Sequence, residues 1–140
     1  MYQMIGTYSG DLKALLEAAR KLPMDRESQG YSSTSNEHAK VEQVMRPLLS
    51  GLFPGKWPYA MVVAVHPNGM LPPHEDTVLT AGVERYHIVL QTNPLAWCMH
   101  DGDWQQLEHG GIYTMVCQQV HAAVNWGIED RIHLVVDTGG

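Results

Sequence analysis

Residues 121–137, HAAVNWGIEDRIHLVVD, contain the pattern that decides the fold of this chain. In the last seven residues an arginine, a histidine and an aspartate occupy alternate positions, and isoleucine, leucine and valine lie between them. Residues 85–92, RYHIVLQT, repeat this alternation, with Arg85 and His87 in the polar positions. Successive side chains of a β-strand point to opposite faces. Each segment therefore predicts a strand with one largely apolar face and one face that lines something polar.

Working outward from these two segments, the chain from residue 58 onward is a series of short β runs. Glycine, proline, asparagine and aspartate separate the runs, as is typical of turns between strands. The predicted strands are residues 59–66, 71–78, 85–92, 95–99, 112–117, 119–124 and 131–137.

The first 56 residues have helical patterns instead. Residues 11–21, DLKALLEAARK, repeat apolar side chains at helical spacing, and Pro23 ends that helix. Residues 36–49 predict a second helix with Asn36 as its cap, and Pro47 within it predicts a kink or a fresh start. Residues 25–35, rich in serine, glycine and threonine, predict a loop.

Two helices followed by seven or eight short strands predict a mainly β protein. The expected architecture is a double-stranded β-helix, a jelly roll related to the cupins. We expect one domain over residues 1–140, with the helical segment 1–56 packed on a β-helix core of residues 57–140. The two helices would then brace one outer face of the sheets.

Three residues with metal-binding side chains stand out: His74, Asp76 and His121. In an extended strand, His74 and Asp76 point to the same side and can converge on one ion, which His121 reaches from a distant strand. Two imidazoles and one carboxylate leave the other positions of the metal open, the geometry of non-haem Fe(II) oxygenases. Zinc sites usually add sulfur or a third imidazole. The competing interpretation is that these are ordinary hydrogen-bonded surface or core residues.

Arg131 follows His121 by ten residues. An arginine that points into a small barrel is costly unless an anion neutralises it, and its planar fork suits a carboxylate. A fixed cation of this kind is what a metal site needs to hold a dicarboxylate co-substrate. The alternative is an exposed edge strand whose charges are solvated.

Four motifs in residues 57–138 then resemble one family: LPPHED, ERYHIVLQTNP, a glycine-containing turn near 108–111, and HAAVNWGIEDRIHLVVD. Their order and spacing are similar to those of the aspartyl/asparaginyl β-hydroxylase-like branch of the 2-oxoglutarate- and Fe(II)-dependent oxygenases. The resemblance implies that iron binds to three residues, His74, Asp76 and His121. It also implies that Arg131 holds the remote carboxylate of 2-oxoglutarate, while Arg85 and His87 contact the other end of that co-substrate.

Composition limits the partners and the location. The net charge is −6 with no basic block, which argues against binding to nucleic acid by charge. The longest apolar run, residues 60–65, is far too short to span a membrane, and no signal peptide opens the chain. Two cysteines do not make a disulfide scaffold, and a ferrous site favours a reducing compartment, so we expect a cytoplasmic protein.

The function predicted from these observations is an Fe(II)/2-oxoglutarate-dependent dioxygenase. It would use O₂ to hydroxylate an Asp, Asn or Pro side chain, in a small molecule, a peptide or a protein. Two alternatives remain open: a non-catalytic cupin-like binding or regulatory module, and a cupin-type metal isomerase. The presence of Arg131 and Arg85 favours the oxygenase over both alternatives. A keto-acid oxygenase needs cationic side chains to bind its anionic co-substrate, and the alternatives do not.

Overall fold

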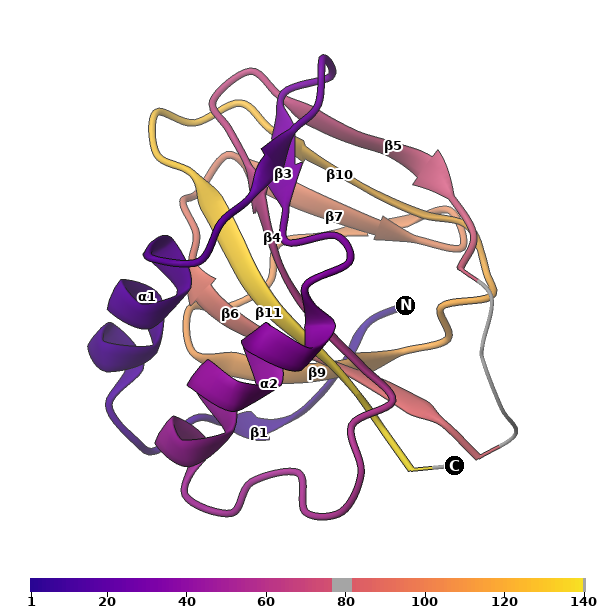
Figure 1. Ribbon diagram of the computed structural model, residues 1–140. Coiled ribbons are helices and arrows are strands. Elements are labelled where there is room, and N and C mark those ends of the chain that lie inside the picture. The colour runs from indigo at the N-terminus through magenta and orange to yellow at the C-terminus, as the bar shows by residue number, and fades with distance from the viewer. Residues whose placement is uncertain (77–81, 140) are drawn as a thin grey trace.

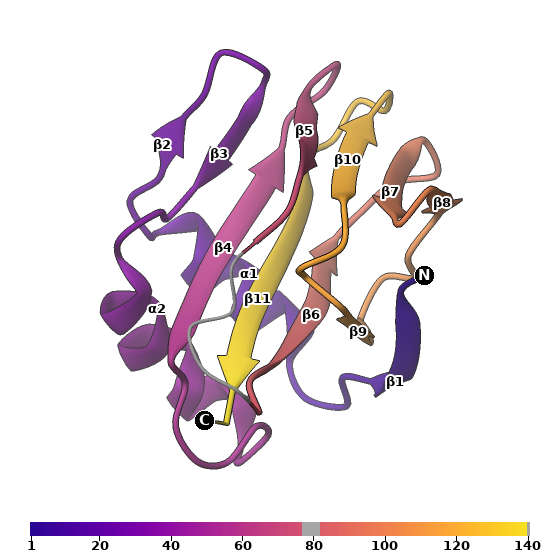
Figure 2. The same ribbon diagram turned by 90° about the vertical axis from the view of Figure 1, so that its right-hand side faces the viewer.

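The computed structural model describes residues 1–76 and 82–139, and its strands form two facing sheets (Figures 1 and 2). The strands are β1 (Gln3–Thr7), β2 (Asp25–Arg26), β3 (Tyr31–Ser33), β4 (Tyr59–Val65), β5 (Met70–His74), β6 (Glu84–Gln91), β7 (Ala96–His100), β8 (Asp103–Gln105), β9 (Gly111–Met115), β10 (His121–Asn125) and β11 (Arg131–Thr138). The larger sheet has the order β1-β9-β6-β11-β4-β3-β2, and the smaller sheet has the order β5-β10-β7-β8. Neighbouring strands pair antiparallel throughout.

The chain winds between the two sheets. Strands β4, β6, β9 and β11 belong to the larger sheet, whereas β5, β7, β8 and β10 belong to the smaller one. The later returns to the larger sheet add strands beside earlier ones: β9 lies between β1 and β6, and β11 lies between β4 and β6. This winding is the predicted double-stranded β-helix, and the fold prediction is confirmed.

The helices α1 (Leu12–Arg20) and α2 (His38–Met45) cover the outer face of the larger sheet, as Figure 2 shows. Their buried side chains share one core with the apolar face of that sheet: Leu15, Val41 and Met45 from the helices, and Ile88, Leu90 and Leu134 from β6 and β11. A second core between the sheets includes Val65, Val89, Cys98 and Ala123. The alternation in β6 and β11 thus places apolar side chains toward the helices and the polar ones between the sheets.

The predicted helices are present, with one correction. Helix α1 is capped by Asp11, whose Oδ1 accepts a hydrogen bond from the Ala14 backbone N–H at 3.0 Å. Helix α2 begins at His38 after Glu37, so the predicted cap at Asn36 is wrong. The fresh start expected at Pro47 is confirmed, because a short 3₁₀ helix, Arg46–Leu49, continues from α2.

Several strand boundaries needed correction. Residues 25–35 are not simply a loop, because β2 and β3 extend the larger sheet beyond β4. The strand predicted at 71–78 ends at His74, and residues 77–78 lie outside the described part of the chain. Strands β1 and β8 were not predicted. Strands β1, β2, β3 and β8 are short or polar, so each takes its conformation from the strand beside it and not from its own pattern.

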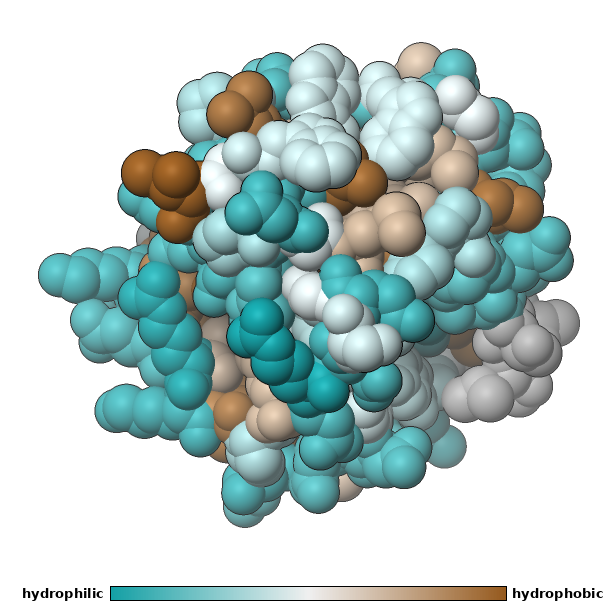
Figure 3. Space-filling model, turned by 90° about the horizontal axis from the view of Figure 1, so that it is seen from above, coloured by the Kyte–Doolittle hydropathy of each residue, from teal (hydrophilic) through white to brown (hydrophobic). Residues whose placement is uncertain are grey.

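The surface seen from above is mostly hydrophilic, with hydrophobic residues in separate patches (Figure 3). No helix in residues 1–76 and 82–139 has the length and apolar character that crossing a membrane requires. Cys98 and Cys117 are both buried as free thiols.

Candidate metal centre

The pairing of β5 with β10 brings the two histidines of the predicted metal site together. His74 is the last residue of β5 and His121 is the first of β10, and the register places them directly opposite each other. Their ring centroids are 4.1 Å apart. Two residues that are 47 positions apart in the sequence therefore meet because the smaller sheet aligns the ends of their strands.

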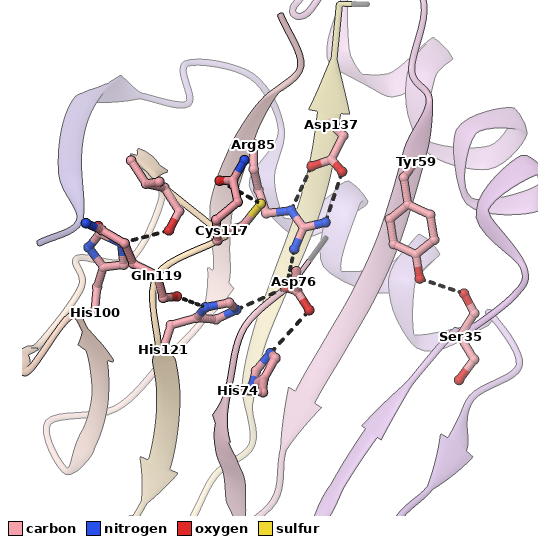
Figure 4. A network of polar contacts seen from close by, with 12 residues as sticks. Ser35, Tyr59, His74, Asp76, Arg85, His100, Cys117, Gln119, His121 and Asp137 are labelled. Atoms are coloured by element: carbon pink, nitrogen blue, oxygen red, sulfur yellow. Dashed lines mark hydrogen bonds and ion pairs between the residues drawn. The ribbon is translucent and has the colours of Figure 1, made fainter. Parts of the chain in front are cut away.

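Asp76 lies two residues beyond the end of β5, where its backbone N–H donates to the carbonyl of Cys117 at 2.8 Å. Its carboxylate sits between the imidazoles: Oδ2 is 3.1 Å from Nε2 of His121, and Oδ1 is 3.7 Å from Nε2 of His74 (Figure 4). One ligand atom from each of these three residues lies within 4.8 Å of the others. Atoms that each bind one ion at about 2.1 Å are at most about 4.2 Å apart, so the three need only a small inward movement.

Backbone carbonyls fix the orientation of both imidazoles. Nδ1 of His74 is 2.8 Å from the carbonyl of Pro72, and Nδ1 of His121 is 2.9 Å from the carbonyl of Gln119. A carbonyl only accepts, so Nδ1 donates in each ring and Nε2 faces Asp76. For His121, both ring nitrogens then face acceptors, which a neutral imidazole cannot satisfy. A proton or a metal ion on Nε2 resolves this conflict, and the arrangement is the usual one for histidine ligands.

Asp76 is an ionised ligand at neutral pH. Burial raises the pKa of Asp76, but the hydrogen bond with His121 and the charges of Arg85, His121 and His74 outweigh it and lower the pKa to about 2. The three residues thus offer two imidazole nitrogens and one hard anionic oxygen to a metal ion. This donor set suits Fe(II) or Mn(II), and the residues present fit the predicted metal.

Arg85 forms an ion-pair network with two carboxylates. Its Nε and Nη2 donate to the two carboxylate oxygens of Asp137 at 2.7 and 2.9 Å, and its Nη1 donates to Asp76 at 2.5 Å (Figure 4). The network is nearly buried, since the Arg85 and Asp137 side chains are 7% and 9% exposed. Asp137 thereby holds the arginine that orients Asp76, a role that its position at the end of β11 did not reveal. Co-substrate binding by Arg85 stays a prediction.

Arg131 is buried in a central strand, which rules out the solvated edge strand. It is 4% exposed, and β11 is paired on both sides by β4 and β6. The side chain lines the same cavity as His74, Asp76 and His121. Its Nε has no hydrogen-bond partner among the described residues. A buried cation with an unused donor is the feature that an anionic ligand would complete.

His87 and His133 form a buried pair beside this arginine, with their Nδ1 atoms 3.1 Å apart. Burial lowers the pKa of His87, and the charges of Arg131 and Arg85 lower it further. Burial and the charge of Arg131 likewise lower the pKa of His133. Both rings are therefore neutral, and Nε2 of His87 has no partner among the described residues.

The histidine pair predicts a loss of stability in mild acid. Above a pH of about 6.5 both histidines are neutral in the folded and unfolded chains. Below it the unfolded chain binds protons that the folded chain excludes, so the free energy of unfolding should fall by at most about 2.7 kcal/mol per pH unit. Urea unfolding between pH 7.5 and 5 in the presence of a chelator measures this slope. The His133→Asn variant should show a shallower slope, and equal slopes would contradict the assignment.

The cavity that these residues share is narrow. Its open space is about 20 Å³, room for roughly one water molecule. A neighbouring groove of about 360 Å³ shares four of its lining residues, Met61, Val63, Leu71 and His74. The two spaces therefore adjoin each other along these four residues.

The fold and the site together define a double-stranded β-helix protein with a cluster of two histidines and one carboxylate that could hold a metal ion. Similar solved structures show the same fold. The non-heme alpha ketoglutarate dependent epimerase SnoN from nogalamycin biosynthesis is 15% identical, with a TM-score of 0.74 over 97% of this chain and 75% of that one. A 2OG-Fe(II) oxygenase family oxidoreductase from Burkholderia pseudomallei is 11% identical, with a TM-score of 0.61 over 90% and 76%. A predicted oxalate decarboxylase from Thermotoga maritima is 13% identical, with a TM-score of 0.57 over 86% and 95%.

Residues 24–139 match the family model described as Aspartyl/Asparaginyl beta-hydroxylase, and the chain belongs to this family. The resemblance seen in the four sequence motifs is thus confirmed. No curated protein sequence matches the chain.

Proposed function

We propose that the protein is an Fe(II)- and 2-oxoglutarate-dependent hydroxylase that acts on an amino-acid side chain, Asp, Asn or Pro. The observation that carries this proposal is the buried side chain of Arg131, which lines the same cavity as the metal-binding cluster and whose Nε has no hydrogen-bond partner among the described residues. A metal site alone fits many functions. A metal site with a buried cation beside it fits a metal-bound acid whose second carboxylate lies deeper in the barrel.

One group of residues would bind the iron, and another residue would bind the co-substrate. His74, Asp76 and His121 would hold iron, and Arg131 would bind the remote carboxylate of 2-oxoglutarate. When bound, iron and 2-oxoglutarate supply the oxidising power, because the co-substrate and O₂ are converted to succinate and CO₂ with one oxygen atom left for the substrate.

The surrounding side chains orient these groups and exclude water. Arg85 and Asp137 hold the carboxylate of Asp76 in place, and Nε2 of His87 is free to meet the co-substrate. Val63, Leu71 and Val135 give the cavity an apolar wall, which keeps its polar contacts strong by keeping water out.

Other chemistries on the same fold are distinguished by the products. A binding module or a metal isomerase has no use for the buried Arg131. An epimerase of the kind named among the similar structures would consume 2-oxoglutarate but leave the mass of its substrate unchanged. Membership of the hydroxylase family favours insertion of oxygen.

The direct test is turnover with candidate substrates. Protein loaded with Fe(II) should form succinate slowly from 2-oxoglutarate alone and faster with the right substrate. Succinate formed should equal substrate molecules that gain one oxygen, measured by mass spectrometry. If no amino acid, peptide or protein increases the rate of succinate formation, the assignment to amino-acid side chains is wrong. Equal succinate and substrate turnover without a mass gain would indicate epimerisation instead.

The expected partners are accordingly a small molecule, a peptide or a protein that presents such a side chain, and neither nucleic acid nor membrane is expected. We place the protein in the cytoplasm, since a ferrous site and two buried free thiols suit a reducing compartment.

A further inference from the structure

The outer face of the smaller sheet is apolar, although neither α1 nor α2 covers it. Both helices pack on the larger sheet (Figure 2). Leu71, Cys98 and Ala123 of the smaller sheet point inward, because they belong to or pack against the core between the sheets. Side chains alternate along a strand, so the residues next to these three point outward. An antiparallel sheet with one face in water usually has polar side chains on that face, and this sheet does not.

The register of the strands joins the outward residues into one patch. Directly opposed residues form two rows across the sheet, Met70–Val124–Trp97 and Ala122–Met99–Trp104. At one end of these strands the Trp126 N–H donates to the Leu95 carbonyl at 3.0 Å, and both of these side chains are exposed. We call these eight residues the outer apolar face.

The composition of the outer apolar face is that of an interface core. It contains three of the four tryptophans in the chain, Trp97, Trp104 and Trp126, which are 36%, 49% and 62% exposed. Tryptophan and methionine are enriched in the cores of protein interfaces, and charged residues are depleted there. The exposed surface of the eight residues amounts to roughly 600 Å², the upper end of what a soluble monomer usually exposes in one apolar patch.

A second copy of the chain fits this face. The net charge is −6, so two copies repel each other unless they meet at an uncharged surface. None of the eight residues is ionisable, so two of these faces come together without burying a charge. Their exposed area is most of the about 800 Å² that each partner contributes to a standard interface, and polar residues at the rim supply the rest. Stacking of two sheets face to face is also a common packing of β-structure.

We propose that the protein forms a homodimer in which the outer apolar faces of two copies pack against each other about a twofold axis. Such an axis makes the contact self-complementary and closes the assembly at two copies. Trp97 lies in the middle of the face, between Val124 on β10 and the edge strand β8, and becomes buried in the dimer. Strands β5 and β10 also hold His74 and His121, so the partner copy covers the back of the strands that position these residues. The dimer does not depend on the proposed function.

The Trp97→Lys variant tests the dimer, because a twofold axis places both introduced charges in one contact. Sedimentation equilibrium at micromolar concentration should give wild type twice the chain mass of 15.6 kDa. The dissociation constant of Trp97→Lys should be at least about a hundredfold higher, since central tryptophans carry much of the energy of an interface. Leu48→Lys is the matched control, because Leu48 is equally exposed, at 37%, but belongs to the 3₁₀ helix that follows α2. It should dimerise as wild type does.

Trp126→Lys provides a second variant in case Trp97→Lys fails to fold. Trp126 is 62% exposed, so its replacement should leave the fold intact, which circular dichroism and thermal unfolding check. Its effect on the dimer should have the same direction and be smaller, because Trp126 lies at the end of the face. Wild type that stays monomeric at high micromolar concentration overturns the proposal. A dimer that both tryptophan variants leave unchanged, or that Leu48→Lys weakens as much as they do, overturns it as well.

Discussion

Replacing Arg131 with alanine should weaken 2-oxoglutarate binding by roughly thirtyfold to several thousandfold and leave metal affinity nearly unchanged. Arg131 is 4% exposed in a central strand, so its charge has no water to compensate it. Removing one partner of a buried, hydrogen-bonded charge pair costs about 2–5 kcal/mol, which corresponds to that range of affinity. Titration of 2-oxoglutarate into protein loaded with Mn(II) measures the effect without turnover.

The Arg131→Lys variant separates the effect of the positive charge from the effect of the guanidinium geometry. An ammonium retains the charge but cannot form the two parallel hydrogen bonds of a guanidinium, so it should restore only part of the affinity. Arg20→Ala is the control, because Arg20 is exposed, lies outside the cavity and donates a hydrogen bond to Gln91. Equal affinity of wild type and Arg131→Ala would remove the main support for an oxygenase over a plain cupin.

The second large effect is expected at the metal. His121→Ala should lower the affinity for Fe(II) or Mn(II) at least about a hundredfold, since changes in groups that merely orient a ligand already cost 10–100-fold. Only His74 and Asp76 would remain as ligands from the cluster. Metal content after dialysis, together with a direct Mn(II) titration, measures the loss. His109→Ala serves as the control, because that histidine is exposed and lies outside the cluster.

Asp76→Ala should behave like His121→Ala and also remove one of the two carboxylates that pair with Arg85. The cavity would then hold a less neutralised guanidinium, which repels a cation. A His121→Ala protein that binds metal as tightly as wild type would rule the site out.

Much of the fold followed from local pattern. A period of two in β6 and β11 predicted their two faces, and the structure places the apolar face on the helices and the polar face between the sheets. The spacing of His74 and Asp76 predicted that both side chains point into one space. These predictions needed only the geometry of a single extended chain, which is set by each residue and its immediate neighbours.

The partners of those side chains depended on the tertiary structure. The bidentate ion pair between Arg85 and Asp137 forms because β6 and β11 are adjacent strands, and their register places these two residues opposite each other. Tyr2 lines the same cavity as Arg131 because β1 lies at one edge of the larger sheet and Gln105, at the edge of the smaller one, bonds the Tyr2 backbone.

The sequence by itself thus determined the strand faces, the family and the candidate metal ligands. Only the tertiary structure decided which carboxylate neutralises Arg85, why Arg131 is left without a protein partner at its Nε, and that an N-terminal tyrosine lines the cavity. The physical reason is that a strand's faces repeat every two residues along the chain, whereas its register with a distant strand is set by the packing of both sheets at once. Short edge strands such as β1 and β8 contain too few residues to specify that register on their own.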